Sequence, residues 1–142
     1  MPRSKSLKLI VDTNLWISFI ISNKQDQLDP ILFAEKARLL FSTELITEIQ
    51  QTITKPKLKK YFATDALEQM LSTFEPFIDL IDVKSVVTIC RDPKDNFLLT
   101  LAKDGKADYL LTGDNDLLDV KKFGKTKIIT LSNFIEVTKN YR

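Results

Sequence analysis

The chain has 142 residues, of which 44% are hydrophobic and 28% are charged, and its formal net charge is +2, a balance typical of one globular domain rather than of a disordered or membrane chain. It contains no histidine and a single cysteine, Cys90, which excludes Ser-His-Asp and Cys-His catalysis, imidazole-based zinc sites and an intrachain disulfide. Any catalysis must therefore use carboxylates, hydroxyls, lysines or a metal ion.

The predicted elements alternate between short apolar runs and longer amphipathic stretches, as is typical of βα units on a parallel sheet. In chain order they begin with a strand at Leu7–Val11, a helix at Leu15–Ile21, a loop at Ser22–Asp29, a helix at Leu28–Lys36, a strand at Arg38–Phe41 and a helix at Thr43–Thr54 that Pro56 stops. They continue with a helix at Thr64–Phe74, a strand at Phe77–Ile81, a helix from Pro93 to about Lys103, strands at Asp108–Thr112 and Lys127–Thr130, and a helix at Ser132–Asn140. The predicted class is α/β, with a central parallel sheet of about five strands in a single domain over residues 1–142.

Acidic residues follow the ends of the predicted strands. Asp12 comes directly after the first strand and Asp114 after the fourth, while Glu48 and Asp95 lie in the early turns of predicted helices. Strand ends and helix starts share one edge of a parallel sheet, so the four carboxylates converge there. This is the edge where open α/β sheets bind ligands, and we expect Gly113 to allow the sharp turn that points Asp114 into it.

Each acid also has a structural interpretation. Asp92, before Pro93, fits a helix N-cap, and Asp95 fits the third position of a capping box. On a helical wheel, Asp95 and Glu48 border the buried stripes of their helices, whereas Asp92 and Glu44 face away from them. We therefore interpret Asp92 as a cap and Glu44 as a favourable first-turn charge.

The convergence itself favours a metal site. Crowded carboxylates at a partly buried sheet edge raise one another's pKa and need a cation, although Asp12 alone would also fit a turn. Oxygen ligands without histidine or paired cysteine match Mg²⁺ or Mn²⁺, and a metal pair could activate water for phosphodiester hydrolysis.

Three segments carry a family resemblance: LIVDTNLWISFII, STELITEIQQTITKPKLKKYF and CRDPKDNFLLTLAKDGKADYLLTGDNDLL. Together they resemble the PIN domain superfamily of metal-dependent ribonucleases, in order from about Leu7 to Phe134. They are most similar to the bacterial and archaeal subfamily described as toxin components of toxin-antitoxin pairs. Residues Met1 to Ser6 lie outside the pattern.

The resemblance implies a three-layer α/β/α sandwich and cleavage of single-stranded RNA with Mg²⁺ or Mn²⁺. It also implies a 5′-phosphate product and a small antitoxin partner that blocks the site. Its acidic positions fall on Asp12, Glu48, Asp95 and Asp114, with Asp116 as an additional acid in the same turn. Two supporting polar positions fall on Asn14 and Thr112.

Two basic clusters are candidates for RNA contact. The first, beside Tyr61 and Phe62, comprises Lys55, Lys57, Lys59 and Lys60. It is suited to gripping phosphates and stacking a base, but it also fits a solvated lysine face over buried aromatic side chains. The same two interpretations apply to the second cluster, which surrounds Gly124 and comprises Lys121, Lys122, Lys125 and Lys127.

These features predict a Mg²⁺- or Mn²⁺-dependent endoribonuclease. In this hypothesis Asp12, Asp95 and Asp114 hold metal, and Glu48 and Asp116 complete the shell or orient water. A noncatalytic RNA- or protein-binding module on the same fold stays open as an alternative.

A metal-dependent phosphatase with Asp12 as nucleophile is a weaker alternative, because Asn14 replaces the second aspartate of the Asp-x-Asp pair. The longest apolar stretches fall short of the roughly 20 residues that a bilayer requires, and the first six residues lack a signal-peptide apolar core. We therefore expect a cytoplasmic protein without membrane contact; a homodimer stays open.

Overall fold

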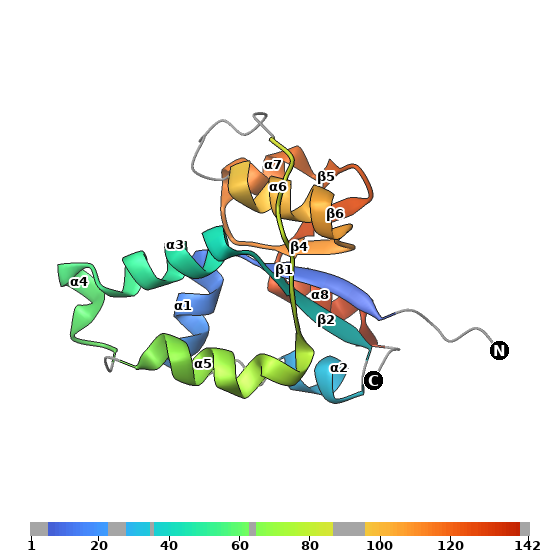
Figure 1. Cartoon of the computed structure of the whole chain (residues 1–142). Coiled ribbons are helices and arrows are strands. Elements are labelled where there is room, and N and C mark those ends of the chain that lie inside the picture. Colours follow the sequence, from blue (N-terminus) through green and yellow to red (C-terminus); the bar gives the residue numbers. More distant parts are fainter. Residues whose placement is uncertain (1–5, 23–27, 35, 63–64, 87–95, 140–142) are drawn as a thin grey trace.

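A computed structural model describes residues 6–22, 28–34, 36–62, 65–86 and 96–139 (Figure 1). The first half comprises β1 (Leu7–Val11), α1 (Thr13–Ser22), α2 (Asp29–Phe33), β2 (Ala37–Phe41), α3 (Thr43–Ile53), α4 (Pro56–Lys59) and α5 (Ala66–Phe74). The second half comprises η2 (Glu75–Phe77), β3 (Ile78–Leu80), α6 (Asn96–Gly105), β4 (Tyr109–Leu111), α7 (Asn115–Val120), β5 (Lys122–Phe123), β6 (Thr126–Ile129) and α8 (Leu131–Val137).

The six strands form one mixed sheet in the order β3-β2-β1-β4-β6-β5. Every neighbouring pair is parallel except β5 and β6, which form an antiparallel hairpin at the edge. The predicted α/β class is confirmed. Four short elements, α4, η2, α7 and β5, were not predicted, because segments of two to six residues are too short to show a periodicity.

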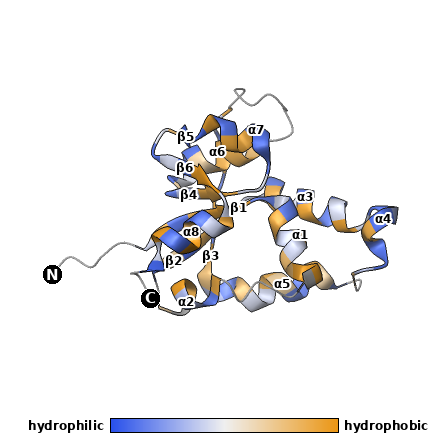
Figure 2. Cartoon of the chain, turned by 180° about the vertical axis from the view of Figure 1, so that it is seen from behind, coloured by the Kyte–Doolittle hydropathy of each residue, from blue (hydrophilic) through white to orange (hydrophobic). Residues whose placement is uncertain are grey.

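Helices cover both faces of the sheet (Figure 1). On one face the Trp16 ring of α1 lies 5.4 Å from that of Phe41, and the Phe134 ring of α8 lies 5.3 Å from that of Tyr109. On the other face α6 approaches so closely that a Cβ at Gly105 would lie 2.7 Å from Cδ1 of Leu40. Figure 2 shows hydrophobic residues along the strands and hydrophilic ones toward the outside of the helices.

The strand order reverses between β1 and β4. From β1 the chain continues to β2 and β3 on one side, and from β4 it continues to β6 on the other. Val11 pairs with Leu111, so the two strands end side by side. The chain then continues from each strand toward a different side of the sheet. Such a reversal opens a crevice at the carboxyl ends of the strands.

None of the helices in the described part of the chain combines the length and apolar composition needed to cross a bilayer.

Candidate active site

Asp12 joins the end of β1 to the start of α1. Its N–H donates to the carbonyl of Leu111 on β4 at 3.0 Å, which continues the sheet ladder by one residue. Its own carbonyl accepts the N–H groups of Leu15 and Trp16, both at 3.0 Å, and so begins the helix. The backbone on both sides therefore fixes Asp12 at the crevice.

Asp12 is only 6% exposed. The Thr112 hydroxyl donates to its Oδ2 at 2.6 Å, and backbone N–H groups of Asn14 and Thr13 also face it. Burial raises the pKa of Asp12 above its ordinary value, and the nearby charge of Asp114 adds to the rise. The hydrogen bonds oppose this shift but do not cancel it.

Asp114 reaches the same crevice from β4. Its N–H donates to the Thr112 hydroxyl oxygen at 3.0 Å, so Thr112 links the two acids by accepting from one residue and donating to the other. The Asp114 side chain accepts the N–H of Asp116 at 2.9 Å and caps α7. One carboxylate thus both faces the crevice and begins a helix.

A pocket of about 390 Å³ opens at this point, lined by Asp12, Asn14, Leu15, Ser18, Gly113 and Asp114. The two polar residues predicted to support the site lie close to it. Asn14 lines the pocket, and the Thr112 hydroxyl donates to Asp12. Ser18 and Leu15 were not predicted as part of the site. The spacing of Ser18 from Asn14, one helical turn, is the signal that could have identified it.

The remaining predicted acids have different positions. Asp116 is joined to the site through its backbone hydrogen bond to Asp114. Glu48 lies half-buried on α3, a helix that packs against α1, but it does not line this pocket. Asp95 and the predicted cap Asp92 lie outside the described residues, within which no three acidic or cysteine side chains are grouped closely enough to hold a metal ion.

Gly113 precedes Asp114 in the turn, and both residues line the pocket, as expected. Its φ is not positive, and a Cβ at this position would meet nothing within 4 Å. The turn therefore does not depend on the conformational freedom of glycine. Instead, the missing side chain leaves the mouth of the pocket open, because Gly113 is exposed in its lining.

The donors at this site fit a hard cation. Neither Asp12 nor Asp114 forms an ion pair with a lysine or arginine in the described ranges. Carboxylate oxygens are the ligand type that Mg²⁺ and Mn²⁺ prefer.

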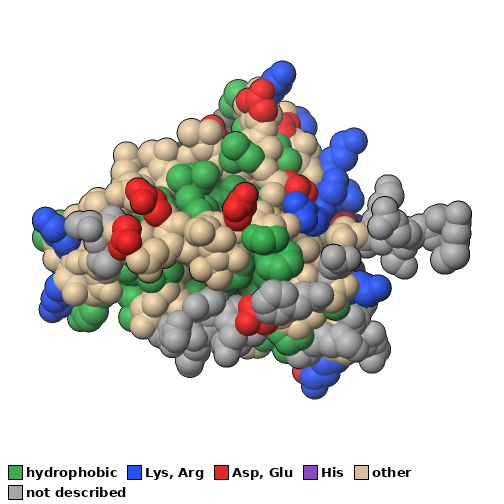
Figure 3. Space-filling view, turned by 60° about the horizontal axis from the view of Figure 1, so that its bottom comes forward, with side chains coloured by type: hydrophobic (Ala, Val, Ile, Leu, Met, Phe, Trp, Pro, Cys, Tyr) green, Lys and Arg blue, Asp and Glu red, His purple; other side chains and the backbone are tan. Residues whose placement is uncertain are grey.

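The two lysine clusters differ in the structure. All four lysines of the first cluster, Lys55, Lys57, Lys59 and Lys60, are exposed in and beside α4, and none forms an ion pair among the described residues. In the second cluster, Lys125 is paired with Asp108 at 3.2 Å. Figure 3 shows Lys and Arg side chains mainly toward the ends of one face, with acidic and hydrophobic ones across its middle.

Comparisons with known proteins agree with this architecture. A model of the PIN domain family matches residues 8–116. An uncharacterized protein of Methanocaldococcus jannaschii is 28% identical over 141 residues, covering 92% of this chain and 90% of that protein. A chain in the crystal structure of VapBC2 from Rickettsia felis, bound to a DNA fragment from their promoter, superposes with a TM-score of 0.58 at 15% identity, over 86% of this chain and 97% of that chain.

Proposed function

Because this chain belongs to the PIN domain family, whose model covers residues 8–116, we propose that it is a Mg²⁺- or Mn²⁺-dependent endoribonuclease of single-stranded RNA. PIN domains are generally nucleases, and those nucleases typically use divalent metals. The observation that carries the proposal is the buried Asp12 carboxylate beside Asp114, at the strand-order reversal and without a cationic partner among the described residues.

The proposal gives each residue a defined task. Asp12 and Asp114 hold the metal together with Asp95, and Glu48 and Asp116 complete the shell or orient water. A bound divalent ion would supply charge neutralisation at the scissile phosphate and a more acidic water. Thr112 holds the Asp12 carboxylate in place, while Asn14 contributes a polar group to the pocket wall.

The RNA approaches through the open mouth at Gly113 in this proposal. The four lysines in and beside α4 contact phosphates beyond the cleavage point in this proposal, since they are exposed and form no ion pair in the described ranges. One domain over residues 1–142 would perform all these tasks.

A nuclease assay tests the proposal directly. A mixed pool of single-stranded RNA is incubated with the chain in Mg²⁺, in Mn²⁺ and in chelator. We expect cleavage with metal only, and its loss in Asp12→Asn, Asp95→Asn and Glu48→Gln. Glu44→Gln is the matched control on α3, because Glu44 is exposed in the first turn, and it should cleave like the parent.

Absence of cleavage in every metal would contradict the nuclease proposal and favour the noncatalytic binding module. Cleavage that survives in Asp12→Asn would show instead that the chemistry lies elsewhere.

We also propose that the chain is the toxin of a toxin-antitoxin pair with a small antitoxin that covers the acids. The support is the family membership and the shared fold with a chain of the VapBC2 structure. Expression of the parent should arrest growth and expression of Asp12→Asn should not. Equal growth of the two would contradict the toxin role without contradicting the nuclease.

A further inference from the structure

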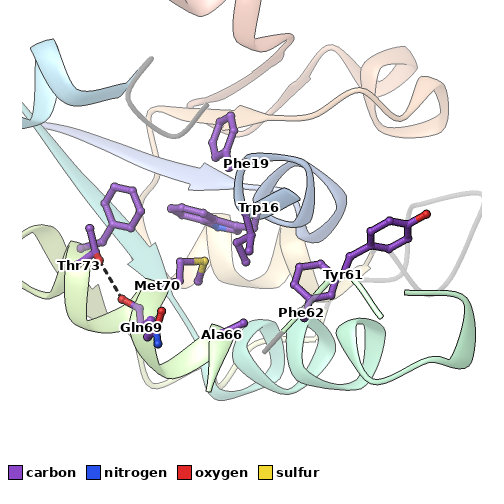
Figure 4. A pocket seen from close by; sticks show the side chains of 10 residues that line it. Trp16, Phe19, Tyr61, Phe62, Ala66, Gln69, Met70 and Thr73 are labelled. Carbon is purple, nitrogen blue, oxygen red and sulfur yellow. Dashed lines mark hydrogen bonds between the residues drawn. The ribbon is translucent and has the colours of Figure 1, made fainter. Parts of the chain in front are cut away.

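A second pocket lies on the other side of α1 from the acids. It encloses about 300 Å³ between α1, the residues after α4, and α5. Half of its ten lining residues are aromatic, namely Trp16, Phe19, Tyr61, Phe62 and Phe74. Figure 4 shows the Trp16 ring at the centre, with Phe62 and Tyr61 to one side and Met70 below.

Trp16 lies at the bottom of the pocket and is only 1% exposed. Its ring centroid lies 5.8 Å from that of Phe19 and 5.3 Å from that of Phe74, both in edge-on arrangements. The indole N–H is buried and has no acceptor among the described residues. Because this nitrogen has almost no accessible surface, the aromatic ring that an occupant can reach lies at the rim of the pocket.

The rim combines an exposed aromatic ring with positive charge. Tyr61 is 57% exposed, and the Lys60 ammonium lies 5.2 Å from its ring centroid. From Thr54 to Phe62 the sequence carries four lysines and no acidic residue. On the opposite wall, Gln69 and Thr73 of α5 supply polar groups (Figure 4).

We propose that this pocket binds one unpaired nucleobase of the RNA, with the four lysines in and beside α4 on the adjoining phosphates. The inference rests on the proposed RNA substrate. The exposed Tyr61 ring can stack on any base, and the neighbouring lysines complement the phosphates. An apolar side chain of a protein partner would leave the lysines unmatched.

The position suits a base flanking the cleaved bond rather than the bond itself. Trp16 is four residues from Asp12, about 6 Å along the axis of α1. The pocket residues Trp16, Phe19 and Ile20 lie on a different face of α1 from Asn14, Leu15 and Ser18, which line the acidic pocket. A strand bound in both pockets would therefore wrap around α1.

Tryptophan fluorescence tests this proposal, because Trp16 is the sole tryptophan of the chain. The full chain is titrated in chelator, which prevents cleavage, with a short oligoadenylate and with an abasic ribose-phosphate of equal length. We expect saturable quenching by the oligoadenylate. The abasic oligomer should cause little quenching and bind more weakly.

Substitutions distinguish the contribution of base stacking to the affinity from that of the phosphate contacts. Tyr61→Ala should weaken oligoadenylate binding roughly five- to a hundredfold, the range for one lost stacking contact, and Tyr61→Phe should restore it. The exposed position of Tyr61 keeps the fold intact, which an unchanged emission spectrum without RNA would verify. Lys60→Gln should lower both affinity and its salt dependence, whereas the exposed Lys36→Gln should alter neither.

Equal binding of the abasic oligomer, unchanged affinity in Tyr61→Ala, or no binding of either oligomer would overturn the base pocket. An unchanged affinity in Tyr61→Ala would indicate that the pocket binds a protein partner instead of a base. Failure of this proposal can be distinguished from failure of the nuclease proposal. Quenching in chelator without cleavage in metal would support the base pocket and contradict the nuclease. Cleavage in metal without any change in Trp16 fluorescence would support the nuclease and contradict the base pocket.

Discussion

At the residue scale, Asp12 lies where its charged form is destabilised. Burial and the charge of Asp114 raise its pKa, and the hydrogen bonds from Thr112 and the α1 backbone do not compensate. A group with a raised folded-state pKa stabilises the fold at low pH and loses that contribution as pH rises through the folded pKa. At neutral pH the metal-free fold therefore carries an unfavourable charge.

Asp12→Asn should keep or raise the free energy of unfolding in chelator at neutral pH, while cleavage is lost. The amide removes the charge but keeps the volume and an acceptor for the Thr112 hydroxyl. Chemical denaturation in chelator and the RNA assay on the same preparation measure both effects. A variant that is clearly less stable yet still cleaves would contradict the assignment of Asp12.

Gly113→Ala should leave stability unchanged or raise it by about 0.4 to 1 kcal/mol, because the backbone is already in a region open to alanine. The added methyl group would project toward open space at the pocket mouth. Thermal melts give the stability. A loss of more than about 1 kcal/mol would show that the turn does depend on glycine at this position.

At the element scale, α7 begins at a residue that also serves the site. The Asp114 side chain accepts the Asp116 N–H, and its backbone carbonyl accepts the N–H of Leu118. Asparagine caps helices as well as aspartate does, whereas alanine does not. The two roles of Asp114 can therefore be separated by substitution.

Asp114→Asn should retain the stability of the parent in chelator, and Asp114→Ala should lose about 1 kcal/mol with the cap. Both variants should lose cleavage, since both remove the charge. Urea denaturation of the pair measures the difference. Equal stability of the two variants would show that the cap contributes nothing.

The carboxylate of Asp104 connects α6 to the segment after β3. It accepts the Ser85 hydroxyl at 2.5 Å and the N–H groups of Ser85 and Lys84 at 2.8 and 2.6 Å. The Ser85 hydroxyl, followed by the two N–H groups, lowers the pKa of Asp104 below its ordinary value of 3.8. The connection therefore depends on the ionised form.

A lowered folded-state pKa contributes stability above the unfolded pKa and loses it as pH falls through the folded value. Asp104→Asn should therefore be less stable than the parent at neutral pH, and the gap should close as pH falls below about 3.8. Denaturation midpoints across acidic pH measure this. The exposed Glu68→Gln on α5 is the control, and an equal loss there would contradict the assignment.

At the scale of the whole molecule, metal binding and folding should be coupled. A metal that binds only the folded state stabilises it by about 2.7 kcal/mol at a hundred times its Kd. Mg²⁺ or Mn²⁺ should therefore raise the melting temperature of the parent, with no such rise in Asp12→Asn or Asp114→Asn. Glu44→Gln should behave like the parent, and a parent insensitive to both metals would contradict the metal site.

Local pattern allowed much of this protein to be predicted from its sequence. Strand-length apolar runs and amphipathic stretches indicated the α/β class because their periodicity is a property of neighbouring residues. Parallel strands share one direction, so acids after Val11 and Leu111 had to lie at one edge. The placement of Asp12 and Asp114 at one edge was predicted in this way, whereas Asn14 and Thr112 were named from the family resemblance.

Tertiary structure alone decided which distant residues meet. The Thr112 hydroxyl bonds to Asp12 across 100 residues, and this contact exists only because β4 pairs with β1. The burial of Asp12, the open mouth at Gly113 and the meeting of Trp16 with Tyr61 likewise depend on strand order and helix packing. Local periodicity specifies the elements and the directions of their side chains, but it does not encode which elements become neighbours, and that choice sets the burial and charge of the site.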